Sequence, residues 1–224
     1  MREDIILHAA GEVTNSYELL GQSGLTTPNQ LFSSSRVSIV SANAGDSVSG
    51  VGVQKVSISG YNNGSAQFEE VDMNGTTTVT TTASFDLIRS ISVSGVGTSG
   101  QQGDITASVF GGNTILVVKK GYLSTHDAVI YLANTYYVDH IDITGDSTDS
   151  NTIYEVNIMR DNGTENVILY TMYWDTDKSI HDYSLDYIPI QGLIWVRCKN
   201  LKHNGPDNVS ISIHLHKKAT LGVK

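Results

Sequence analysis

Near its C-terminal end the sequence reads Val209-Ser210-Ile211-Ser212-Ile213-His214-Leu215. In this segment four aliphatic side chains alternate with two serines and a histidine. A period of two places the aliphatic side chains on one face of an extended strand and the polar side chains on the other face. The segment therefore predicts a β-strand that buries one face.

The same alternation recurs along most of the chain. It runs from Phe85 to Val93, where only Arg89 interrupts the apolar face. The spacing of about 8–15 residues between such segments is typical of a β-sandwich or barrel. Further strands are expected at residues 37–40, 53–59, 67–73, 76–82, 105–110, 115–119, 128–132, 136–143, 153–160, 166–174 and 193–199.

Three Asn-Gly pairs supply turn residues between these segments: Asn63-Gly64, Asn74-Gly75 and Asn162-Gly163. Asn and Gly tolerate the positive φ angles that tight hairpins require, so each pair predicts a hairpin. No segment shows a sustained apolar stripe with a period of 3.6 residues. We therefore expect an all-β fold with two consecutive antiparallel domains of the β-sandwich or jelly-roll type.

Composition divides the chain into three parts. Residues 1–32 lack a periodic apolar face, which predicts an irregular N-terminal arm that is mobile in the free protein. Residues 33–112 form a β domain rich in Ser, Thr and Gly. Residues 113–224 form a second β domain, which holds both Trp and most Tyr, and the change occurs at Gly111-Gly112-Asn113.

Charge and hydropathy exclude several classes of protein. The 14 Lys and Arg against 23 Asp and Glu give a net charge of −9, whereas binding to nucleic acid requires a basic face. No apolar run approaches the roughly 20 residues that span a bilayer. Residues 1–10 are too short and too acidic for a secretory signal peptide. We expect partners other than nucleic acid or membrane.

The single cysteine, Cys198, excludes an intramolecular disulfide framework and a cysteine-based zinc site. It shares the apolar face of Ile194 and Val196, which predicts a buried and unreactive thiol.

Histidines offer the best candidate for metal binding. His214 and His216 lie about 7 Å apart on one face of a strand, and His140 could add a third ligand from another strand. Because His214 and His216 lie on the polar face of a terminal strand beside Lys217, we favour ordinary surface histidines. We therefore expect no metal site and no cofactor.

Carboxylates are numerous, but their spacing indicates no calcium loop. Asp139 and Asp142 are interpreted as solvated acids, together with Asp146, Asp149, Asp175 and Asp177. Asp46 and Asp104 each follow a glycine at a strand boundary, where Asp most often caps a turn. The sequence also lacks the Gly-x-Ser-x-Gly nucleophile elbow and a phosphate-binding glycine loop. We therefore expect no catalytic residues and a protein that is not an enzyme.

Aromatic residues gather in the segment 170–174 and at Tyr183 and Tyr187. They could form a platform on which sugars stack, but on strands such residues are more often core.

The region 35–108 resembles a pattern common in virion structural proteins of tailed bacteriophages, especially marine ones. The resemblance rests on a Gly-flanked strand from Val51 to Tyr61, followed by Phe68-Glu69-Glu70-Val71-Asp72-Met73-Asn74-Gly75-Thr76. A threonine-rich segment, an aromatic-basic strand and Gly103-Asp104-Ile105-Thr106 complete the pattern. This chain departs from it in Met73, where Leu is commoner, and in its aromatic second half.

The resemblance implies a non-enzymatic structural protein located in the virion and assembled in the host cytoplasm. A capsid decoration (cement) protein is favoured, with the major capsid protein and neighbouring virion proteins as partners. Such a protein is expected to be a homo-oligomer, with a trimer favoured. The alternatives are a tail, baseplate or fibre-associated protein and a module that binds host glycans.

Overall fold

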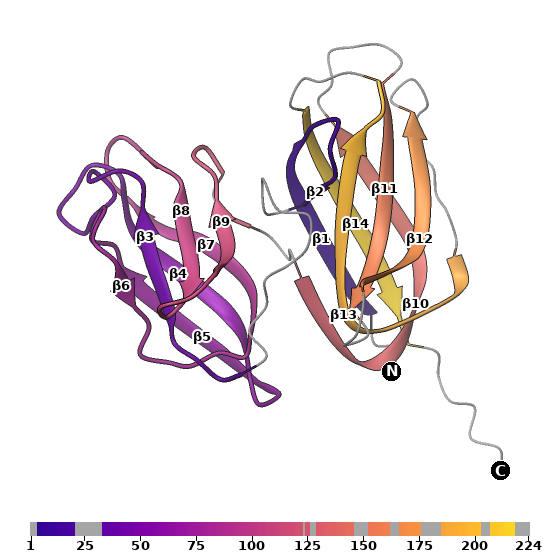
Figure 1. Ribbon diagram of the computed structural model, residues 1–224, viewed down its shortest axis with the longest axis horizontal. Coiled ribbons are helices and arrows are strands. Elements are labelled where there is room, and N and C mark those ends of the chain that lie inside the picture. The colour runs from indigo at the N-terminus through magenta and orange to yellow at the C-terminus, as the bar shows by residue number, and fades with distance from the viewer. Residues whose placement is uncertain are drawn as a thin grey trace. The chain divides into compact units, whose positions relative to one another are not determined.

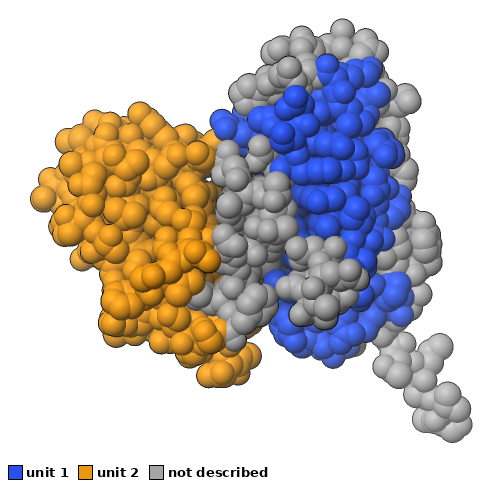
Figure 2. Space-filling view, viewed as in Figure 1, with its two compact units in different colours: residues 1–20, 128–224 blue, residues 21–127 orange. Residues whose placement is uncertain are grey.

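The computed structural model describes residues 4–20, 33–122, 124–125, 129–145, 152–161, 166–175, 185–202 and 207–217. In these ranges all elements of regular secondary structure are β-strands, and every pairing between strands is antiparallel (Figure 1). The prediction of an all-β antiparallel fold is therefore confirmed. The chain divides into two compact units (Figure 2): unit 1 comprises residues 1–20 and 128–224, and unit 2 comprises residues 21–127.

Unit 1 contains a seven-stranded sheet with the order β1-β14-β10-β13-β11-β12, and β2 also pairs with β13. Its strands are β1 (Asp4–Val13), β2 (Glu18–Leu19), β10 (Val129–Gly145), β11 (Ile153–Asp161), β12 (Asn166–Asp175), β13 (Leu185–Asn200) and β14 (Asp207–His216). The first half of β10 pairs with β13 and its second half pairs with β14. β10 therefore joins β13 and β14 into one sheet.

The sheet folds over a core to which every long strand of unit 1 contributes. Trp174 of β12 packs so closely on Gly145 of β10 that a Cβ there would lie 2.9 Å from the indole ring. Tyr154 stacks on the same indole, with 5.2 Å between ring centroids. The aliphatic residues of β14 face this core as predicted: Val209, Ile211, Ile213 and Leu215.

The predicted N-terminal arm is wrong for residues 4–20. β1 pairs with β14 from Asp4↔His216 to Val13↔Asp207, and Leu7, Ala9 and Val13 are fully buried. The strand was missed because Ala9 and Gly11 weaken its apolar alternation. Residues 21–32 lie outside the described residues.

The predicted order of two consecutive domains also needs correction. Unit 2 is inserted between the two segments of unit 1, at residues 21–127. The predicted boundary at residues 112 and 113 is wrong, because Thr114–Val118 pairs with Ile105–Val109 inside unit 2.

Unit 2 contains a four-stranded sheet of order β6-β3-β8-β9 and a three-stranded sheet of order β5-β4-β7. Their strands are β3 (Val37–Ser41), β4 (Val53–Asn62), β5 (Ser65–Asp72), β6 (Val79–Thr80), β7 (Leu87–Val96), β8 (Ile105–Val109) and β9 (Thr114–Val118).

The Asn-Gly predictions have different outcomes. Asn63 and Gly64 have φ angles of 51° and 75° and close the β4–β5 hairpin, as predicted. The pairing Asp161↔Asn166 confirms the β11–β12 hairpin, whose turn lies outside the described residues. Asn74-Gly75 closes no hairpin, because β5 pairs with β4 and β6 pairs with β3. The strand expected at residues 76–82 is limited to Val79–Thr80, the two residues that pair with β3.

A buried carboxylate holds unit 2 together where β3, β4 and the segment before β8 meet. Asp46 is fully buried and accepts hydrogen bonds from the Ser41 hydroxyl at 2.6 Å and the Val53 N–H at 2.7 Å. It also accepts the N–H groups of Gln102 at 3.0 Å and Gly103 at 2.9 Å. Four donors therefore satisfy one buried carboxyl group and join three segments of the chain.

Two glycines make this junction possible. A Cβ on Gly52 would overlap the Oδ1 atom of Asp46. Gly75 has a φ of 61°, donates its N–H to the Asp46 carbonyl at 2.7 Å and lies against Ala44. Asp104 accepts the Lys120 N–H at 2.8 Å, from a residue sixteen positions along the chain. The prediction that Asp46 and Asp104 cap their own turns therefore needs correction, because both carboxylates bond to backbone N–H groups of other segments.

We predict that Asp46→Ala destabilises unit 2 by about 4 kcal/mol, because it leaves several buried N–H groups without an acceptor. Asp72→Ala is the control and should cost less than about 1 kcal/mol, since Asp72 is 62% exposed. Both Trp lie in unit 1, so their fluorescence reports that unit while circular dichroism reports both. In urea, Asp46→Ala should shift the dichroism transition and leave the fluorescence transition in place. A wild-type dichroism curve for Asp46→Ala would contradict this role.

Candidate functional site

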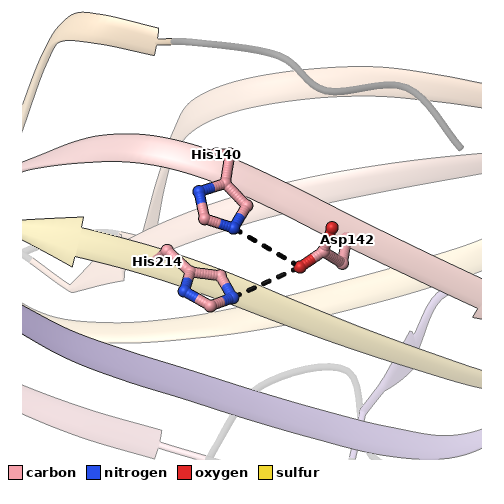
Figure 3. Close-up of side chains that lie close together, drawn as sticks. All are labelled: His140, Asp142 and His214. Carbon is pink, nitrogen blue, oxygen red and sulfur yellow. Dashed lines mark ion pairs between the residues drawn. The ribbon is translucent and has the colours of Figure 1, made fainter.

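A cluster of imidazoles and carboxylates lies on the side of β10 and β14 that faces away from the core. His140 and His214 are cross-strand partners, and their rings stack with centroids 3.8 Å apart. The Asp142 carboxylate reaches both rings (Figure 3). Its Oδ2 atom lies 3.2 Å from His214 Nε2 and 3.6 Å from His140 Nε2. One carboxylate oxygen thus bridges two imidazoles.

Two more residues extend this cluster along the strands. Asp139 Oδ2 lies 3.4 Å from His140 Nδ1, and Asp139 Oδ1 lies 3.8 Å from His216 Nδ1. We call the series His216, Asp139, His140, Asp142 and His214 the His–Asp row. Because each carboxylate lies between two imidazoles, the row can share protons or hold a cation.

A β-bulge in β10 creates the row. The pairing with β14 shifts between Val138↔Leu215 and His140↔His214, which leaves Asp139 as the extra residue. Val138 and Ile141 are both buried, although strict alternation would place them on opposite faces. The bulge therefore allows Asp139 and His140 to contribute to the same outer face.

The structure changes the grouping that spacing suggests. The sequence places His214 beside His216, whereas the structure joins His214 to His140 through Asp142. Asp139 and Asp142 were interpreted as solvated acids, but both lie in β10 within the row. This grouping depends on the register shift between β10 and β14, which the sequence of either strand alone does not show. Asp146, Asp149 and Asp177 lie outside the described residues.

A second polar cluster fastens the segment before β2 onto the sheet. The Tyr17 hydroxyl donates a hydrogen bond to Glu155, and Lys199 Nζ lies 3.0 Å from the same carboxylate. The Arg197 guanidinium lies 4.0 Å from the centroid of the Tyr17 ring. These contacts hold the Tyr17 ring and the Glu155 carboxylate against β11 and β13.

Glu155 has a lowered pKa as a result. Burial raises the pKa of this carboxyl, but the hydrogen bonds from Tyr17, Lys199 and Asn157 outweigh burial and lower it overall. The same contact with Glu155 raises the pKa of Lys199.

Cys198 is buried in the core of unit 1, as predicted. Burial raises the pKa of its thiol, and the nearby Glu155 and Asp207 carboxylates raise it further. The thiol therefore stays protonated at neutral pH and is a poor nucleophile.

The aromatic segment 170–174 does not form one platform. Met172 and Trp174 face the core, which confirms the favoured interpretation for these two residues. Tyr173 points the other way and is 60% exposed. Tyr183 lies outside the described residues.

Comparisons of the chain with protein-family models, with curated proteins and with solved structures find no match. In the part of the chain that the structure describes, no helix has the length and hydropathy to cross a membrane.

We predict that Glu155→Gln destabilises unit 1 by about 2 kcal/mol at pH 7, because it removes two charge-assisted hydrogen bonds. A lowered pKa in the folded state means that the carboxylate stabilises the fold above its unfolded-state pKa and loses this effect as pH falls through the folded-state pKa. The difference between wild type and variant should therefore shrink in acid, measured by urea unfolding with Trp fluorescence between pH 3 and pH 7.

The control is Glu70→Gln, which removes an exposed ion pair with Lys55 in unit 2 and should leave this fluorescence transition unchanged. A Glu155→Gln effect of the same size at every pH would contradict the assigned role of the carboxylate.

Proposed function

We propose that the chain is a non-enzymatic structural protein of a tailed-bacteriophage virion, which decorates and stabilises the major capsid shell. The observation that carries this proposal is where the residues of the resembling pattern lie in the structure. Gly52, Gly75 and Gly103 belong to the resembling pattern and all lie around the buried Asp46. The pattern therefore coincides with the junction on which unit 2 depends, which supports a shared β unit.

The surface of unit 2 is compatible with protein partners. Val48, Val51 and Val96 each expose half or more of their side chains, and Phe68 of β5 is 67% exposed. Val48 and Val51 precede β4, and the Val51 carbonyl accepts the Ser99 N–H from the segment after β7, whereas Val96 ends β7 and Phe68 lies in β5. These side chains are available for contacts with a protein partner.

The net charge of −9 suits the outside of a shell better than a surface against packaged DNA. Attachment would come from many weak contacts, which linked copies multiply through effective concentration. The N-terminal segment 4–20 does not serve as an extension over a neighbour in this proposal, since it completes unit 1. The oligomer is proposed to be a trimer on a capsid symmetry axis.

A glycan-binding module on the virion is the second candidate. It is favoured by Tyr131 and Tyr173 of unit 1, which are 55% and 60% exposed. Exposed Tyr rings can stack on sugars, whereas Trp174 is buried and cannot.

Quantitative mass spectrometry of purified particles tests the proposal. We predict hundreds of copies per particle, because a decoration protein repeats with the capsid lattice. Particles that lack the protein should rupture more readily under heat or osmotic shock and should adsorb to host cells normally.

About a dozen copies or fewer would indicate a tail location instead. Absence from the particle, or normal rupture resistance without the protein, would contradict a decoration role. Loss of adsorption on Tyr173→Ala, with a stable shell, would favour the glycan-binding module.

A further inference from the structure

We propose that His140, Asp142 and His214 form a binding site for one divalent transition-metal ion, with Zn²⁺ the best fit. The ligand atoms are the Nε2 atoms of the two histidines and a carboxylate oxygen of Asp142. This inference concerns the isolated chain and does not depend on the proposed virion function.

The two separations from the carboxylate oxygen to the imidazole nitrogens are close to those around a tetrahedral metal. With metal–ligand bonds of about 2.1 Å, two ligand atoms at the tetrahedral angle lie about 3.4 Å apart. Asp142 Oδ2 lies 3.2 Å from His214 Nε2 and 3.6 Å from His140 Nε2, on either side of that value. One ligand atom from each of the three residues lies within 4.8 Å of the others.

A neighbouring carboxylate orients one of the ligands. Asp139 Oδ2 lies 3.4 Å from His140 Nδ1, on the side of the ring opposite the ligand atom. A carboxylate there favours the tautomer with the proton on Nδ1, which leaves the lone pair of Nε2 for a metal. Ligating histidines in metal sites commonly have such a partner.

The framework holds all three side chains on paired strands. His140 and His214 are opposite each other in the β10–β14 register, and Asp142 is two residues beyond His140 on the same strand. All three side chains are half-buried. Little backbone movement is therefore needed, and most of the ordering cost is met when the sheet forms.

Metal binding does require one adjustment. The two rings are now nearly parallel, with an interplanar angle of 17°. A metal must lie in the plane of each ring that it binds, so the rings must turn toward each other. The terminal torsion of a histidine is soft, so this rotation is inexpensive.

The set of donors selects the kind of metal. Two imidazoles and one carboxylate suit Zn²⁺ and its neighbours Ni²⁺ and Cu²⁺. Ca²⁺ prefers six or more oxygen ligands, which one carboxylate does not supply. Three protein ligands leave the fourth position of a tetrahedral ion for water or for a group from a neighbouring molecule.

This proposal revises the sequence-based expectation of no metal site. That expectation weighed His214 and His216 as a pair, with His140 as a third ligand, and did not include Asp142. In the structure Asp142, rather than His216, is the third member beside His140 and His214, and the three side chains form a compact set of possible ligands. The competing interpretation is an ion triad, in which Asp142 pairs with protonated imidazoles and no metal is bound.

The test is titration of the full chain, free of affinity tags and stripped with a chelator, with Zn²⁺ by calorimetry and with Co²⁺ by visible absorption. We predict one ion per chain, a tetrahedral Co²⁺ spectrum and a melting temperature of unit 1 that rises by several degrees. His140→Asn, His214→Asn and Asp142→Asn should each abolish the spectrum. Asp139→Asn should weaken binding about tenfold, because it removes the orienting carboxylate.

His8→Asn is the matched control, since His8 lies on neighbouring β1, bonds to Ser212 at 2.8 Å and is outside the cluster. It should bind as the wild type does. Circular dichroism of each metal-free variant checks its fold. NMR of the histidine ring nitrogens in the wild-type chain needs no variant, and Zn²⁺ should shift Nε2 of His140 and His214 but not His8.

Absence of saturable binding would overturn the site in favour of the ion triad. Binding that survives in folded His140→Asn and His214→Asn, or NMR shifts confined to other histidines, would equally overturn it.

Discussion

The pairing of β1 with β14 is the constraint on which the rest of the structure depends. It joins residues about as far apart as the chain allows, since His8 and Ser212 are 204 positions apart and bond at 2.8 Å. Because β1 contributes Leu7 and Ala9 to the core, unit 1 closes only when both ends of the chain are present. Unit 2 is therefore an insertion, and unit 1 must overcome a large loop-closure entropy.

Strong local patterns in the sequence predicted most strands and two hairpins correctly. The alternation of residues 209–215 and the pair Asn63-Gly64 each specify a structure by local chemistry alone. For Asp46 the sequence predicted only a local turn cap, because Asp after Gly at a strand boundary most often plays that part. What the sequence could not show is that Asp46 receives N–H groups from Gln102 and Gly103, more than fifty positions away.

The parts that the sequence did not predict depend on pairing partners. β1 has Ala9 and Gly11 at alternating positions, which weakens its apolar pattern, and only its pairing with β14 places Ala9 in the core. The His–Asp row depends on a bulge at Asp139, which shifts His140 relative to the alternation of its own strand. At Asn74-Gly75 the chain does turn, but it passes from the sheet that contains β5 to the sheet that contains β6 and closes no hairpin. Register is a property of two strands, so one strand's pattern does not reveal it.

Native-state hydrogen exchange across residues 4–13 tests the central claim, that the N-terminal segment is an integral strand of unit 1. The account predicts that the hydrogen-bonded amides of β1 exchange as slowly as those of β14, because both are released only when unit 1 unfolds. Rapid exchange of residues 4–13 beside a protected β14 would instead show a mobile arm and would contradict the account.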